Sequence, residues 1–81
     1  MIEIWSKPHC PYCDKAESLC KQKNLEFKKY MLDVDYTRED LFAKFPSART
    51  FPQITIDGVL IGGYTEFAAQ ITAEIKTIWI N

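Results

Sequence analysis

The chain has 81 residues, 47% of them hydrophobic and 26% charged, and ten Lys and Arg against eleven Asp and Glu residues give a net charge of −1. This length and balance are typical of a single globular domain, residues 1–81, and argue against a disordered chain. No basic block favours nucleic acid, no apolar run is long enough to span a membrane, and the first residues lack a secretory leader. We therefore expect a cytoplasmic protein with no membrane or nucleic-acid partner.

The first half of the chain predicts a strand, a helix and a second strand. Residues 1–6 alternate between two faces, as in a short strand. From Pro11 to about Lys23, apolar residues recur at helical spacing, and Asn24 is suited to end that helix. Residues 26–32 predict a second, less regular strand. The apolar face of the helix consists of Cys13, Ala16, Leu19 and Cys20.

The middle of the chain predicts a short helix and a hairpin. Thr37 is a credible N-cap for a helix from Arg38 to about Phe45, with two acidic residues in its first turn. Gln53 to Ile56 and Val59 to Gly62 predict two strands, and the Asp-Gly pair between them favours a two-residue turn.

From Tyr64 onward the spacing of apolar residues predicts a long amphipathic helix. The expected buried residues of the last two helices are Leu41, Phe42, Phe45, Phe67, Ala68, Ile71, Ile75 and Ile78. A right-handed crossover makes the first two strands parallel, and the hairpin adds an antiparallel pair. The predicted fold is therefore α/β, with a four-stranded mixed sheet and three helices on its two faces in the order β-α-β-α-β-β-α.

Cys10 and Cys13 lie where the first strand gives way to the first helix. At the N-cap, free N–H groups and the positive end of the helix dipole point at the Cys10 sulfur and stabilise its thiolate. Lys7 adds positive charge if it lies nearby. Cys13, one turn further in, is close enough to attack a mixed disulfide on Cys10. The position predicts a redox pair in a reducing compartment, with Cys10 as nucleophile and Cys13 as resolving thiol.

Two other interpretations of Cys10 and Cys13 remain, a zinc site and the chance spacing of two structural cysteines. Zinc needs two more ligands, and the candidates His9 and Cys20 give poor tetrahedral geometry, so no metal is expected. Cys20 falls on the apolar helix face, where a small buried hydrophobe is the expected role. His9 is expected in an exposed loop.

Three motifs together resemble one family. They are Cys10-Pro11-Tyr12-Cys13, Thr50-Phe51-Pro52-Gln53-Ile54 and Gly62-Gly63-Tyr64-Thr65-Glu66-Phe67. Their order and spacing resemble the dithiol glutaredoxins of the thioredoxin fold over essentially the whole chain. The likeness is strongest to the small bacterial and phage-type glutaredoxins, including the class that serves ribonucleotide reductase.

The resemblance implies a groove for glutathione. Pro52 matches the family's cis-proline, and Phe51, where valine is usual, would pair through its backbone with the cysteinyl part of glutathione. The start of the last helix would bind the γ-glutamyl part, although its residues also fit an ordinary helix start. Lys7 and, more weakly, Arg49 are candidates for the glycine carboxylate. The implied glutathione-binding residues are Lys7, Tyr12, Thr50, Phe51, Pro52, Gly63, Tyr64, Thr65 and Glu66.

The activity implied by the resemblance is glutathione-dependent reduction of protein disulfides and glutathione mixed disulfides. Glutathione is the co-substrate, no metal is required, the protein acts as a monomer, and ribonucleotide reductase is the suggested protein partner. Two alternatives remain: a thioredoxin-like protein recharged by a reductase, and a module that binds glutathione or an iron–sulfur cluster without turnover.

Overall fold

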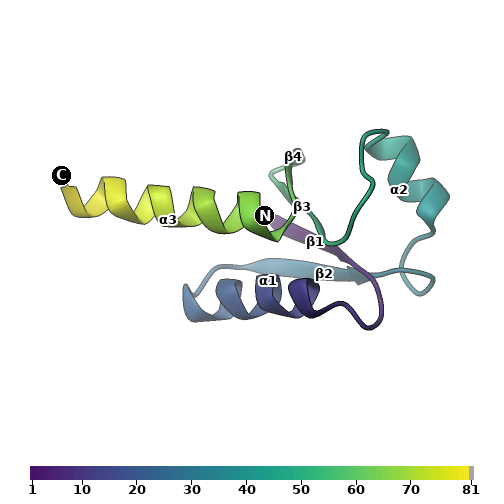
Figure 1. Ribbon diagram of the computed structural model, residues 1–81, viewed down its shortest axis with the longest axis horizontal. Coiled ribbons are helices and arrows are strands. Elements are labelled where there is room, and N and C mark those ends of the chain that lie inside the picture. Colours follow the sequence, from purple (N-terminus) through teal and green to yellow (C-terminus); the bar gives the residue numbers. More distant parts are fainter. Residues whose placement is uncertain (81) are drawn as a thin grey trace.

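The computed structural model describes the backbone of residues 1–80 and the side chains of residues 1–72. Its elements follow the predicted order, and each predicted boundary lies within one residue of the observed one (Figure 1). The elements are β1 (Ile2–Ser6), α1 (Pro11–Gln22), β2 (Phe27–Met31), α2 (Arg38–Lys44), β3 (Gln53–Ile56), β4 (Val59–Gly62) and α3 (Tyr64–Ile80).

The four strands form one mixed sheet in the order β2-β1-β3-β4. β1 and β2 are parallel, and β3 is antiparallel to both β1 and β4. Asp57 and Gly58 take positive φ angles of 51° and 83°, as a type I′ turn requires, and this turn matches the twist of a hairpin. The predicted α/β fold is confirmed, and it places β1 inside the sheet with its end directed towards the start of α1.

One face of the sheet packs against α1 and α3. This cluster is aliphatic except for one aromatic ring and one thiol, and its members are Ile2, Ile4, Ala16, Cys20, Ile54, Phe67 and Ile71. α3 continues well past the sheet, which gives the molecule its long dimension of 43 Å (Figure 1). The predicted core positions Ile75 and Ile78 lie outside the described side chains. Within the described residues, no helix combines the length and apolar character that a membrane crossing needs.

The other face of the sheet carries an aromatic cluster. The Trp5 ring stacks on Tyr30 with centroids 4.6 Å apart, and Tyr36 meets it edge-on at 5.1 Å. The buried Tyr36 hydroxyl donates a hydrogen bond to the Ser6 carbonyl at 2.7 Å. The buried members of the cluster are Trp5, Leu32, Tyr36, Leu41 and Ala48.

α2 covers this second face with a single buried residue, Leu41. Phe42, which we expected in the buried face, is 36% exposed, so that prediction is wrong. Successive helical residues are about 100° apart, so Phe42 lies to the side of Leu41, where the Arg49 guanidinium is 5.9 Å from its ring centroid. Phe45 lies just beyond the last helical residue and packs partly buried against the cluster.

Candidate active site

The chain passes from β1 into α1 through a short loop that ends at Cys10. α1 begins at Pro11, where the missing N–H of proline leaves no donor unpaired. Cys10 is the N-cap, and its sulfur accepts a hydrogen bond from the N–H of Cys13 at 3.2 Å. His9, in the loop, is exposed with a φ of 57°, as expected for a loop residue. The predicted N-cap position of Cys10 is confirmed.

Cys10 and Cys13 form a disulfide, and their Cα atoms are 5.2 Å apart. Cys10 is 7% exposed and Cys13 only 1%, so an incoming sulfur reaches Cys10 more readily. After reduction, the Cys13 N–H and the positive end of α1 favour the thiolate form of Cys10. The arrangement therefore favours Cys10 as the attacking sulfur.

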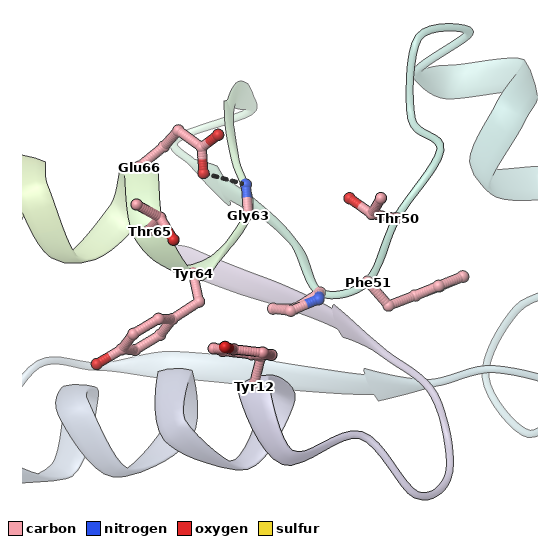
Figure 2. A pocket seen from close by; sticks show the side chains of 8 residues that line it. Tyr12, Thr50, Phe51, Gly63, Tyr64, Thr65 and Glu66 are labelled. Carbon is pink, nitrogen blue, oxygen red and sulfur yellow. Dashed lines mark hydrogen bonds between the residues drawn. The ribbon is translucent and has the colours of Figure 1, made fainter.

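A groove of about 180 Å³ opens at Tyr12, between the two cysteines in sequence. Three segments form it: the start of α1, the loop before β3, and the turn from β4 into α3 (Figure 2). Its lining residues are Tyr12, Thr50, Phe51, Pro52, Gly63, Tyr64, Thr65 and Glu66. The structure thus brings together the residues that the resemblance assigned to glutathione except Lys7 and the weaker candidate Arg49, which lie outside the lining.

At one end of the groove, the turn into α3 offers backbone N–H groups. The first helical hydrogen bond runs from the Phe67 N–H to the Gly63 carbonyl, at 3.1 Å. The N–H groups of Tyr64, Thr65 and Glu66 precede that bond, so the helix itself supplies them no acceptor. The Glu66 carboxylate accepts a hydrogen bond from the Gly63 N–H at 3.2 Å (Figure 2). This end can therefore offer donors to a carboxylate and a carboxylate to an ammonium group.

The middle of the groove lies between two tyrosine rings and the loop before β3. The Tyr12 and Tyr64 centroids are 6.0 Å apart, and both rings lie beside α1 (Figure 2). The Phe51–Pro52 peptide bond is cis, as the resemblance implied. The side-chain amide of Gln53 donates to the Thr50 carbonyl at 2.8 Å and holds this loop in place.

At the other end, two positive side chains lie over the Phe51 ring. The Lys7 Nζ is 5.7 Å from the Phe51 ring centroid, and the Arg38 Cζ is 5.4 Å from the same centroid. Sequence reasoning missed Arg38, because no spacing or motif connects the first residue of α2 to the loop at Phe51. Arg49, the weaker candidate, lies against Phe42.

Cys20 is separate from this site. It is fully buried between α1 and the sheet, in the cluster that also contains Phe67. Burial, followed by the negative charge of Glu17, raises the pKa of the Cys20 thiol to about 11. The thiol is therefore neutral at physiological pH, and its burial confirms the expected role as a small hydrophobe.

The described residues hold no group of three or more His, Cys, Asp or Glu side chains placed to bind a metal ion. The two further zinc-ligand candidates have different environments, because His9 is in an exposed loop and Cys20 is in the core. Neither completes a ligand set with the cysteine pair.

Known proteins resemble this chain in sequence and in fold. The sequence model of the Glutaredoxin family matches residues 2–61, which include both cysteines and the cis-proline. A probable glutaredoxin of Synechocystis is 41% identical over 69 residues, covering 84% of this chain and 78% of that protein.

Two solved structures extend the comparison. Reduced Escherichia coli glutaredoxin superposes with a TM-score of 0.72 at 33% identity, covering 93% of this chain and 96% of that one. A buckwheat glutaredoxin–glutathione complex superposes with a TM-score of 0.76 at 25% identity, covering 90% of this chain and 69% of the other. The likeness therefore extends beyond the cysteine motif to the arrangement of the whole fold.

Proposed function

Since the chain belongs to the glutaredoxin family and is a glutathione-dependent thiol–disulfide oxidoreductase, we propose which of its residues perform each part of that reaction and where glutathione binds. Cys10 is the nucleophile and Cys13 the resolving thiol. Glutathione lies along the groove, with its γ-glutamyl end at α3 and its glycine end towards Phe51. The observation that carries the proposal is a groove that opens at Tyr12, between the N-capping Cys10 and Cys13 in sequence. It has backbone N–H groups and the Glu66 carboxylate at one end and cations beside Phe51 at the other.

In the reduction of a glutathione mixed disulfide, the Cys10 thiolate attacks the glutathione sulfur. A Cys10–glutathione disulfide forms, the original S–S bond breaks, and the substrate leaves as a thiolate that takes a proton from water. A second glutathione thiolate then attacks the sulfur of the bound glutathione. This step releases glutathione disulfide and restores the Cys10 thiolate.

In the reduction of a protein disulfide, Cys10 forms a mixed disulfide with one substrate cysteine. Cys13 then attacks the Cys10 sulfur, releases the second substrate thiolate and forms the Cys10–Cys13 bond seen here. Two glutathione molecules reduce that bond. We propose ribonucleotide reductase as one such substrate and the cytoplasm as the compartment, because the cycle consumes reduced glutathione. We also propose that the whole chain, residues 1–81, acts as one domain and as a monomer.

Each part of glutathione has a proposed partner in the groove. The γ-glutamyl carboxylate accepts from the N–H groups at the start of α3, and the ammonium group pairs with Glu66. The cysteinyl backbone pairs with that of Phe51, which directs the glutathione sulfur at Cys10. The Tyr12 ring lies against the tripeptide, and Lys7 attracts the glycine carboxylate.

The test is glutathione-coupled reduction of a small mixed disulfide by the wild type, Cys10→Ser and Cys13→Ser. We expect Cys10→Ser to show only the background rate and Cys13→Ser to keep substantial activity, because this route needs one thiol. Cys20→Ala is the matched control and should retain activity, since Cys20 is buried away from the groove. An active Cys10→Ser would overturn the assignment of the nucleophile. A wild type driven by a thioredoxin reductase but not by glutathione would overturn the groove assignments.

A further inference from the structure

The Phe51 side chain has an environment that the glutathione assignments do not explain. Lys7 and Arg38 come from the end of β1 and the start of α2, far apart in sequence, yet both lie over the same ring. Phe51 also packs against the aromatic cluster on the second face of the sheet. The ring is therefore fixed by the core and presents its remaining surface to two cations.

These cations lack the acidic partners that surface lysines and arginines often have. In the part of the chain with described side chains, no carboxylate lies within 4.0 Å of the Lys7 or Arg38 nitrogens. Two like charges at one place repel each other, and the negative face of an aromatic ring offsets part of that repulsion. Phe51 thus gathers two unpaired positive charges at one end of the groove.

We propose that Phe51 is a positioning and specificity-determining residue whose ring holds Lys7 and Arg38 as a paired-cation site. The site favours disulfides in which an acidic residue directly follows the reactive cysteine. The inference rests on the proposed function, because it takes the residue after the cysteine to lie at the Phe51 end. A valine, usual in the family at this position, offers the cations no aromatic face.

The substrate class follows from this placement. In glutathione, the residue after the cysteine is a glycine that carries a free carboxylate. An Asp or Glu directly after a protein cysteine places a side-chain carboxylate at a similar distance from the sulfur. Fixed guanidinium and ammonium groups attract it most strongly at low ionic strength. The preference should therefore extend to protein disulfides that share no other feature with glutathione.

The experiment uses the full-length reduced protein and two symmetrical peptide disulfides in single-turnover reactions without glutathione. The peptides are N-acetyl-Cys-Glu-amide and N-acetyl-Cys-Gln-amide, which differ only in the charge after the cysteine. Cys10 attacks one peptide sulfur and expels the other peptide as a thiol, and Cys13 then displaces the bound peptide. Each turnover converts one peptide disulfide and two protein thiols into two peptide thiols and the Cys10–Cys13 disulfide.

For the wild type we expect the Glu peptide to react about five-fold faster than the Gln peptide at low salt, and the ratio to approach one at high salt. Phe51→Leu should reduce the low-salt ratio to below about two, because the cations disperse into solvent. Phe51→Tyr should keep the wild-type ratio. Phe42→Leu, which removes the other ring that faces an arginine, should keep it too, since Phe42 does not line the groove.

The ratio of the Glu-peptide rate to the Gln-peptide rate distinguishes a positioning role of Phe51 from a purely structural one. A ring that only supported the fold would, when replaced, slow both peptides equally and leave the ratio unchanged, and that result would overturn the inference. A wild type with equal rates for both peptides would also overturn it while leaving the proposed function intact. A wild type that reduces glutathione disulfide but reacts with neither peptide would overturn it as well, whereas failure with glutathione disulfide itself would reject the proposed function.

Discussion

The two faces of the sheet carry different kinds of side chain. The face beneath α1 and α3 is mostly aliphatic, and Ile4, Ile54 and Phe67 in it are completely buried. The face beneath α2 is aromatic and has polar and charged neighbours: the Lys44 Nζ is 5.3 Å from the Trp5 ring centroid. The first face is suited to hold the fold together, and the second is suited to hold charged side chains near the groove.

The second face also differs from the first in carrying a carboxylate that accepts side-chain hydrogen bonds. Glu3, from the middle of β1, accepts hydrogen bonds from the Tyr30 hydroxyl at 3.0 Å and the Thr55 hydroxyl at 3.2 Å. The hydrogen bond to Glu3 is the main cause that raises the pKa of Tyr30 above its ordinary value. The groove draws on both faces, because its lining residue Tyr64 packs against the first cluster and its lining residue Phe51 against the second. The two ends of the groove are therefore supported by different faces of the sheet.

The contrast is tested most strongly by removing one core side chain from each face. Phe67→Ala should lower the free energy of unfolding by about 3–5 kcal/mol, because it empties the centre of the aliphatic face. Leu41→Ala should cost about 2–4 kcal/mol and should speed hydrogen exchange mainly in α2, which has no other buried residue. Denaturant unfolding with hydrogen exchange measures both. Uniformly faster exchange in Leu41→Ala would show that the two faces unfold as one unit.

Alkaline pH should weaken the two faces in different ranges. Burial is the main cause that raises the pKa of Cys20 from 9.0 to about 11 and that of Tyr36 from 10.0 to about 12. An unfolded chain loses these protons first, so Cys20 contributes stability below pH 9 that disappears by about pH 11, and Tyr36 contributes stability that disappears from about pH 10 to 12. Each loss should be about 3 kcal/mol, since each pKa is raised by about two units.

The matched variants for this pH dependence are Cys20→Ala and Tyr36→Phe. Unfolding free energies of the oxidised protein at several pH values should show Cys20→Ala approaching the wild type from pH 9 upwards. Tyr36→Phe should approach it only from pH 10, since the wild type loses its advantage as the group ionises. Parallel curves for the wild type and both variants would contradict the burial of these groups.

A smaller effect is expected where α2 begins. The Thr37 hydroxyl accepts from the Asp40 N–H at 3.1 Å, and the Asp40 carboxylate accepts from the Thr37 N–H at 3.0 Å. Thr37→Ala should lower the free energy of unfolding by about 1 kcal/mol, whereas Thr37→Ser should keep most of it. Equal losses in both variants, measured by denaturant unfolding, would mean that the cap hydroxyl is not what holds α2.

The smallest effect concerns the outer side of the first face, where Lys29 connects β2 to α1. Its Nζ is 3.0 Å from a Glu17 carboxylate oxygen and 3.5 Å from one of Asp14. Lys29→Met should cost about 0.5 kcal/mol at low salt and less at high salt. The hydrogen bond from Lys29 is the main cause that lowers the pKa of Glu17, so NMR titration of the variant should show that pKa rising. Lys21→Met, which removes a longer contact to Glu17, should change it less.

Local rules were sufficient to predict the elements and their ends. Thr37 was predicted as the N-cap of α2, and Asn24 takes a φ of 56° just after α1, as a helix-ending residue often does. The Asp57-Gly58 turn was predicted for the same reason: a short motif with one favoured backbone geometry. Such features depend on neighbours in sequence, so the sequence contains the information needed to find them.

Features that depend on tertiary contacts were predicted less well. Phe42 fits the apolar pattern of α2, but it lies about 100° around the helix from the buried Leu41 and is exposed. Arg38 reaches Phe51 only because the fold brings α2 over the loop before β3. The groove itself was anticipated by three motifs, whose resemblance to a family supplied the long-range proximity that periodicity does not show.

The groove's three segments have a consequence for the chain as the ribosome makes it. The cysteine pair is made before the last wall of the groove, which contains Thr65 and Glu66. A chain stopped before that wall contains both cysteines and lacks one of the three segments that form the groove. The groove can therefore be complete only after residue 66 has been made, when both cysteines are already in the nascent chain.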